Sequence, residues 1–182
     1  MKPLRADAER SVQAILEAAE RVLSADPGAS MERIAEAAGV ARTTIHRRFA
    51  TREALIEALA VSAVRQIEEA VAAARPRTAP PLVALHQATA NILGVKLAWR
   101  FAVSQIAPGS AAAQIQRRVT AEGEEIMWRL QQAGLIRAGT DLAWARRVHR
   151  GLLDTATGPE ETETDPDLLA ARIVETLLHG LG

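Results

Sequence analysis

Residues 30–53 constrain the fold of this chain more than any other stretch, and they read SMERIAEAAGVARTTIHRRFATRE. Ser30 is of a residue type that caps helix N-termini, and apolar residues follow it at helical spacing. Gly39 tolerates the left-handed conformation in which helices commonly end, and a second short helix is predicted over residues 41–48. Two short helices joined by a tight glycine-containing turn form a helix-turn-helix unit, whose second helix enters the major groove of DNA.

The second of these helices is expected to have a buried side and a basic side. Ile45 and Phe49 lie four residues apart and therefore share one face. Residues 41–52 hold four arginines and no acid, whereas the whole chain has no net charge. A local basic patch favours DNA because the attraction to phosphate is short-ranged at cellular salt. The alternative interpretation of the four arginines is a solvated helix face.

Four groups of residues in the first third of the chain have the ungapped spacing of a known family: Ile15-Leu16-Glu17-Ala18-Ala19, Ile34-Ala35-x-x-Ala38-Gly39-Val40, Thr44-Ile45-His46-x-x-Phe49 and Arg52-Glu53-Ala54-Leu55. Through them, residues 15–59 resemble the TetR family of transcriptional repressors. Ala41 stands where a small hydroxyl residue is common in the family, and Thr43 where glycine is common. His46 replaces the usual tyrosine and Arg52 the usual lysine, which changes the reach of both side chains.

Helical periodicity and helix breakers predict an all-α chain of about nine helices. The expected ranges are 7–24, 31–38, 41–48, 52–74, 81–92, 95–105, 111–133, 141–157 and 166 onward, with Gly94 ending or kinking the fifth helix. The proline-rich residues 75–81 form the clearest linker. The functional boundary is placed at Thr51, between a three-helix helix-turn-helix DNA-binding domain (1–51) and a helical ligand-binding and dimerisation domain (52–182).

The side chains predicted to meet double-stranded operator DNA are Ser30, Arg42, Thr43, Thr44, His46, Arg47, Arg48 and Arg52. Arg42 and Arg47 have the geometry to bond bidentately to guanine, worth ~1–3 kcal/mol of discrimination for each good pair. Thr43 suits a thymine methyl group, and His46 a base edge or a phosphate. Thr44, Arg48 and Arg52 are predicted as phosphate anchors, together with amides at the starts of the second and fourth predicted helices. Surface solubilisation is the alternative for each of them.

The resemblance implies a homodimer that binds a palindromic operator and an effector pocket among the central helices. The candidate pocket residues are His86, Trp99, Phe101, Met127, Trp128 and Trp144, which suggest a small, largely apolar effector. The candidate dimer residues are Leu142, Val148, Leu152, Leu153, Leu169, Ile173 and Leu177, on the last two helices. Both sets have the same alternative, which is burial in the core of the single chain. A second functional hypothesis is control by a protein partner instead of a small molecule.

The sequence also excludes several classes of protein. The raw material for catalysis is His86, His149, Asp154 and the acidic residues 160–167, without a catalytic motif or metal-ligand spacing, so we expect no enzyme, cofactor or metal. Cysteine is absent, which excludes disulfides and thiolate sites. No leader opens the chain and no apolar run reaches ~18 residues, which predicts a soluble, cytoplasmic protein without a membrane partner.

Overall fold

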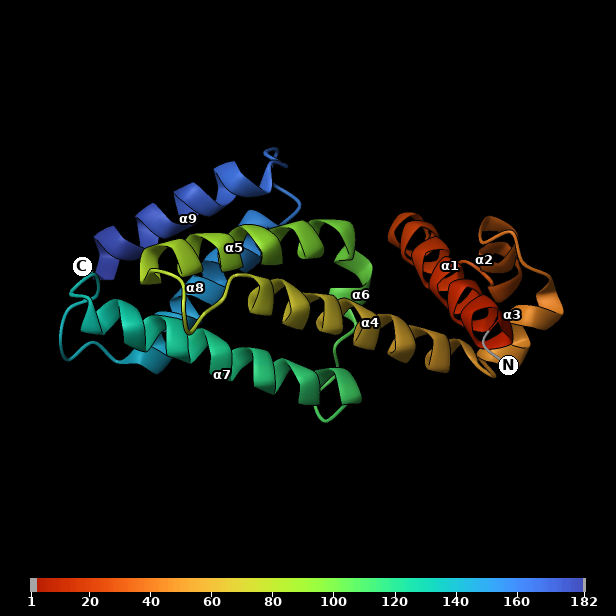
Figure 1. The fold of residues 1–182 in the computed structure, drawn as a ribbon. Coiled ribbons are helices and arrows are strands. Elements are labelled where there is room, and N and C mark those ends of the chain that lie inside the picture. Colours follow the sequence, from red (N-terminus) through yellow and green to blue (C-terminus); the bar gives the residue numbers. More distant parts are fainter. Residues whose placement is uncertain (1–2, 182) are drawn as a thin grey trace. The chain divides into compact units, whose positions relative to one another are not determined.

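The computed structural model describes residues 3–181, and every regular element among them is an α-helix (Figure 1). The helices are α1 (Pro3–Ala25), α2 (Met31–Ala37), α3 (Arg42–Arg48), α4 (Arg52–Ala73), α5 (Pro81–Ala98), α6 (Arg100–Ser104), α7 (Ala111–Gln132), α8 (Leu142–Ala156) and α9 (Pro166–Leu181). The prediction of an all-α fold with about nine helices is therefore confirmed for the described residues.

The local signals for helix ends are confirmed at several places. Ser30 caps α2, since its hydroxyl oxygen accepts a hydrogen bond from the amide of Arg33. Thr51 caps α4 in the same way, accepting from the amide of Ala54 at 3.1 Å. Asp141 caps α8 through two amides of its first turn, and α9 begins at Pro166. These ends depend on residues within three positions of each other, which is why the sequence predicts them.

The prediction that a helix ends at Gly94 is wrong, whereas a kink there stays a prediction. The helix α5 continues through Gly94 to Ala98, because the flanking residues, such as Leu93, are packed in the core and glycine costs a helix only about 1 kcal/mol. The chain instead leaves helical geometry at Trp99 (φ −125°, ψ 45°). The predicted helix 95–105 is thus divided between the end of α5 and the short α6. The first helix also starts earlier than predicted, at Pro3.

The chain divides into two compact units. The first comprises the residues up to Ala63 together with Trp99–Ala113, and the second comprises Val64–Ala98 and the residues from Gln114 onward. The predicted functional boundary at Thr51 lies inside the first unit and stays a prediction, because compactness does not test where a function divides.

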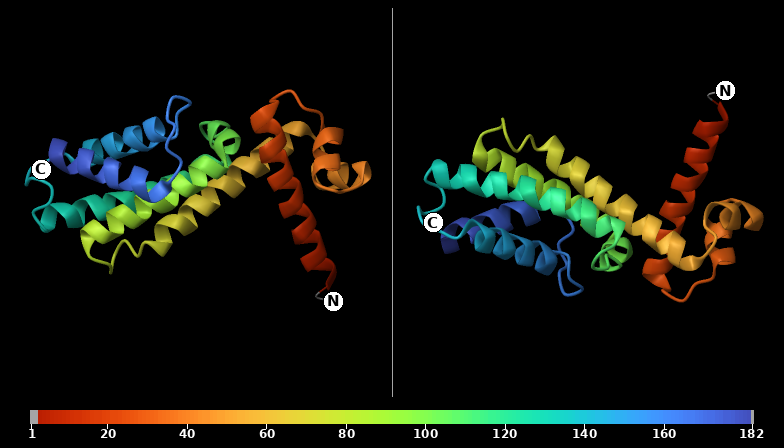
Figure 2. Two further views of the ribbon diagram at one scale, coloured as in Figure 1. Left: turned by 90° about the horizontal axis from the view of Figure 1, so that it is seen from above. Right: turned by 90° about the horizontal axis from the view of Figure 1, so that it is seen from below.

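In the first unit α1 packs on α2 and α6, and α2 packs on α3. Figure 2 shows α1 in red and α2 and α3 in orange. Its core contains Ile15, Leu23, Ile34, Ile45, Phe49, Leu55 and Leu59. In the second unit α5, α8 and α9 pack against one another. Two apolar clusters fill it, one centred on Leu85, Met127, Leu130 and Ile136, and the other on Leu93, Leu153, Leu169 and Ile173.

Candidate nucleic-acid interface

The turn between α2 and α3 sets the position of the predicted reading helix. Gly39 adopts φ +66°, a conformation that other residues rarely take, and the amide of Val40 donates to the carbonyl of Ala35 at 3.0 Å. The short helix α3 follows and is held by Ile45 and Phe49, both of which are buried. Burial of these two side chains fixes which face of α3 points outward.

The outward face of α3 carries the basic residues. Arg42 and His46 are four residues apart, as are Thr43 and Arg47, so they form two adjoining rows on the helix surface. All four of these residues and Arg48 are exposed, whereas Thr44 is half-buried. The structure therefore brings these six predicted DNA-binding residues together on one short helix. Their contact with DNA stays a prediction.

A carboxylate that the sequence analysis did not consider lies against this face. Glu32, in the first turn of α2, forms an ion pair with Nη2 of Arg42 at 2.9 Å and lies 3.4 Å from Nε2 of His46. A hydrogen bond from its own backbone amide, followed by the one with His46, lowers the pKa of the Glu32 carboxyl below its usual range. Glu32 is therefore ionised at neutral pH, and its negative charge lies beside the basic residues of the reading helix.

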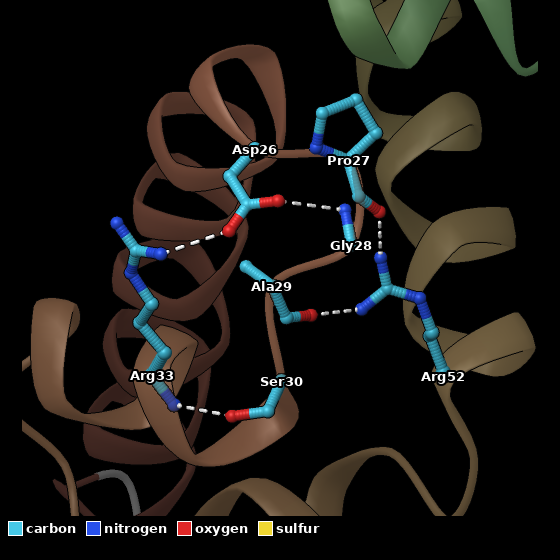
Figure 3. A network of polar contacts seen from close by, with 7 residues as sticks. All are labelled: Asp26, Pro27, Gly28, Ala29, Ser30, Arg33 and Arg52. Atoms are coloured by element: carbon cyan, nitrogen blue, oxygen red, sulfur yellow. Dashed lines mark hydrogen bonds and ion pairs between the residues drawn. The ribbon is translucent and has the colours of Figure 1, made fainter.

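Arg52 has a structural partner that its predicted role did not anticipate. Its two terminal nitrogens donate to the backbone carbonyls of Pro27 and Ala29, in the loop that precedes α2 (Figure 3). The guanidinium thus connects the first residue of α4 to the start of the helix-turn-helix unit. Contact of Arg52 with a phosphate stays a prediction, whereas its bonds to the loop are a feature of the structure.

The loop 26–30 is also held by Asp26, which follows the end of α1, and by Arg33 of α2. The two oxygens of Asp26 accept from the amide of Gly28 at 3.0 Å and from Nη1 of Arg33 at 2.8 Å. Ser30, which caps α2, follows directly (Figure 3). The loop 26–30 therefore contacts three helices. Of these contacts, the ion pair between Asp26 and Arg33 could have been indicated by the sequence, because the two residues are only seven positions apart.

The predicted effector residues are divided between the two units. Trp99 and Phe101 belong to the first unit, and the other four candidates to the second. Met127 is fully buried in the core, and His86 is half-buried on α5. Trp128 and Trp144 are 50% and 54% exposed, so they lie on the surface and do not line an enclosed cavity.

Recesses among the described residues of the second unit include the following two. One, of about 420 Å³, is lined by Glu68, Val71, Ala72, Arg75, Pro76, Arg77, Thr78, Arg118, Val119 and Glu122. The other, of about 430 Å³, is lined by Ala121, Glu124, Glu125, Trp128, Leu142 and Ala143. Of the six predicted effector residues only Trp128 lines either recess. An effector site among these residues therefore stays a prediction.

The predicted dimer residues divide by burial. Leu153, Leu169, Ile173 and Leu177 are buried in the two apolar clusters of the second unit. Leu142, Val148 and Leu152 are partly buried against these clusters. The side chains of the first four are packed in the core of the single chain, which was the alternative to a place in the dimer interface. Helical spacing alone cannot distinguish a core face from an interface.

Neither a membrane span nor a metal cluster is found in the described part of the chain. No helix there combines the length and the apolar composition needed to cross a bilayer. No group of three or more His, Asp or Glu side chains within residues 3–181 has the arrangement to hold a metal ion.

Known proteins resemble this chain both in sequence and in fold. A family model for bacterial regulatory proteins of the tetR family matches residues 15–59. The HTH-type transcriptional repressor LfrR of Mycolicibacterium smegmatis is 33% identical over 148 residues, which cover 80% of this chain and 76% of that repressor.

Solved structures resemble more than nine tenths of the chain. The structure of LfrR from Mycobacterium smegmatis in complex with proflavine has a TM-score of 0.71 at 27% identity, over 95% of this chain and 98% of that one. The TetR family regulator PfmR from Thermus thermophilus has a TM-score of 0.76 at 18% identity, over 92% of this chain and 98% of that one, a similarity of fold alone.

Proposed function

This chain belongs to the TetR family and is a helix-turn-helix transcriptional regulator, and on that premise we propose that it is a repressor that binds a palindromic operator as a dimer and is released by a small, largely apolar effector. The observation that carries the proposal is the outward face of α3, where Arg42, Thr43, His46 and Arg47 are exposed beside the buried Ile45 and Phe49.

The chemistry of this face suits the major groove. Arg42 and Arg47 each offer five N–H donors in a planar fork, the geometry that guanine O6 and N7 accept. Thr43 contributes a methyl group that fits against thymine. Thr44 and Arg48, at the side of the same helix, anchor phosphates and fix the register. The salt dependence of binding then reports the phosphate contacts, and base preference reports the two arginines.

Dimerisation follows from the small size of the reading helix. The helix α3 has 7 residues, which is too few to specify a unique operator in one half-site. Two copies related by a two-fold axis read a palindrome, with half-sites about one helical turn of DNA apart or a multiple of it. The helices α8 and α9 are the proposed site of pairing, through positions other than the core residues Leu153, Leu169, Ile173 and Leu177.

Release by an effector requires a structural element that is coupled both to the DNA-binding surface and to the effector site. The helix α4 begins at Arg52 in the first unit and ends at Ala73 in the second, so it is continuous between them. A ligand shifts the equilibrium only if it prefers one position of this helix over another. LfrR has been solved in complex with proflavine, a precedent in a relative for binding of a small molecule.

Selection from randomised duplex DNA, followed by sequencing of the bound pool, tests the proposal. The expected result is a palindrome. In the selected operator, Arg42→Ala should relax the base preference at one position, whereas Arg48→Ala should weaken all sequences alike and reduce the salt slope by about 0.9. Absence of enrichment with refolded, ligand-stripped protein would overturn the proposal.

The effector is tested separately by thermal shift with a panel of neutral apolar, aromatic and highly charged small molecules. Compounds that raise the melting temperature are then added to the operator complex, and the fraction of DNA released is measured. An apolar or aromatic ligand that releases DNA is the expected result. A panel in which only highly charged compounds bind would contradict the proposed class of effector.

A further inference from the structure

Glu32 is an acidic residue on a surface proposed to face a polyanion. Its carboxylate contacts two residues of α3, Arg42 at 2.9 Å and His46 at 3.4 Å, which lie on one edge of that helix. The side chain of Glu32 is 43% exposed, so this carboxylate lies at the surface of the helix-turn-helix unit formed by α2 and α3, here called the reading head. The negative charge of Glu32 repels approaching DNA phosphates. How strongly this charge affects binding depends on whether Arg42, its partner, contacts a base or a phosphate.

The geometry of the ion pair leaves Arg42 able to bind a base. Arg42 reaches Glu32 through Nη2, and the side chain as a whole is 72% exposed. Nη2 carries two hydrogens, so one bidentate edge of the planar guanidinium, formed by Nη2 with either Nη1 or Nε, remains available to an acceptor. Glu32 can therefore restrict the orientation of Arg42 without occupying all of its donors, which reduces the entropy lost when the guanidinium binds.

The same pair makes a phosphate contact by Arg42 costly. If the guanidinium turned to the DNA backbone, it would leave Glu32 without its arginine partner beside a phosphate. If it bonds to guanine from its present orientation, the carboxylate stays compensated. The pair therefore favours contact with base edges over contact with the sequence-independent backbone.

We propose that Glu32 is a specificity-determining positioning residue of the reading head, which holds Arg42 and His46 toward base edges and disfavours their use as phosphate contacts. This inference rests on the proposed function, since it requires Arg42 to read DNA. According to this inference, α2 contributes to sequence discrimination through Glu32 even if α2 itself does not contact DNA.

A matched pair of variants tests the role of Glu32. Glu32→Gln removes the charge but keeps the size of the side chain. Glu36→Gln makes the same change one turn further along α2, at an exposed residue that forms no ion pair among the described residues. Dissociation constants are measured by fluorescence anisotropy for the selected operator and for a scrambled duplex of equal length, at several salt concentrations.

The two variants should differ in the ratio of the two dissociation constants. Glu36→Gln should tighten both complexes by a similar factor, since it only lowers general repulsion. Glu32→Gln should tighten the scrambled complex but not the operator complex, so that the specificity ratio falls by up to about fivefold, the upper end for an exposed pair. In an Arg42→Ala background, most of this selective effect should disappear.

The outcomes separate the inference from the function on which it rests. If Glu32→Gln changes both complexes in parallel, as Glu36→Gln does, the inference is overturned and the proposed reading role of Arg42 stands. If Arg42→Ala leaves operator binding and base preference unchanged, the reading role itself fails. Melting temperatures of all variants, expected to be nearly equal because the exchanged groups are on the surface, exclude unfolding as the cause of either result.

Discussion

Arg52, the first residue of α4, donates from its guanidinium to the backbone carbonyl of Ala29, the residue that precedes the N-cap of α2 (Figure 3). A second nitrogen of the same group donates to Pro27. The usual lysine of the family at this position has a single ammonium, which lacks the planar fork that reaches two carbonyls at once. The arginine that this chain has in place of the family's usual lysine therefore braces the loop 26–30.

Arg52→Lys should destabilise the protein although it keeps the charge. We expect the free energy of unfolding to fall by about 1 kcal/mol, because one or both charge-assisted bonds to the loop are lost from a partly exposed site. Chemical denaturation measures this change. Arg48→Lys, at an exposed position of α3, is the control and should leave stability unchanged.

The salt dependence of operator binding separates the two roles of Arg52. If it only braces the loop, Arg52→Gln should weaken binding without changing the slope of log K against log salt. A slope lower by about 0.9 would identify the phosphate contact predicted from the sequence. A stability of Arg52→Lys equal to that of the unmodified chain would contradict the brace.

Glu20 holds the start of α6 from a distant part of the chain. Its buried carboxylate accepts from the amides of Phe101 and Ala102, at 2.8 and 2.9 Å. Glu20→Ala should lower the free energy of unfolding by about 2–3 kcal/mol, because two amides lose their partner in a buried site. Glu20→Gln, which keeps one carbonyl oxygen, should cost less. Denaturation of both is compared with Glu17→Ala, an exposed acid on the same helix, whose change should stay within ~0.5 kcal/mol.

His149 should make the stability of the chain depend on pH below neutrality. Its Nε2 lies 2.9 Å from the hydroxyl of Thr89, which itself donates to the carbonyl of Leu85 at 2.7 Å. The hydroxyl has one hydrogen, so Nε2 is the donor in a neutral imidazole. Burial lowers the pKa of His149 to about 4, from an ordinary value of 6.5. Between these two pH values the unfolded chain binds the proton and the folded chain does not.

The free energy of unfolding should therefore fall as the pH is lowered from 6.5 toward 4, by about 2 kcal/mol at pH 5. His149→Gln, which keeps a donor but does not titrate, should lose this part of the pH dependence. His179→Gln is the control, because that side chain is 79% exposed. Denaturation curves at pH 7, 6 and 5 measure the three proteins. Equal pH dependence of the His149→Gln variant and the unmodified chain would show that His149 is not held neutral by burial.

Ser30→Ala should loosen α2 and with it the reading head. Loss of the cap leaves the amide of Arg33 without its partner and should cost about 1 kcal/mol. Hydrogen exchange of the α2 amides is expected to accelerate, and operator affinity to decrease slightly. Ser30→Thr retains the hydroxyl and should restore both properties. Unchanged exchange at Arg33 in the alanine variant would show that the cap does not limit the stability of this helix.

The sequence predicted the features that depend on neighbouring residues. The caps at Ser30 and Thr51, the turn at Gly39 and the shared buried face of Ile45 and Phe49 all involve residues within a few positions. Motif spacing then indicated the family, which the comparisons confirm. A helix end at Gly94 was predicted wrongly because a local breaker signal is weak where the surrounding helix is packed.

Only the tertiary structure decided which distant groups meet and which apolar faces are buried. The bonds of Arg52 with Ala29 and of Glu20 with Phe101 join residues 23 and 81 positions apart, and no spacing rule connects them. Helical periodicity likewise could not show that Leu169 is core and Trp144 exposed, since it marks an apolar face but not what covers it. The sequence by itself therefore determined the helices, their local ends and the type of reading head. The packing of those helices decided how the reading head is braced and which charges accompany it, because these contacts depend on the distance between residues in space and not along the chain.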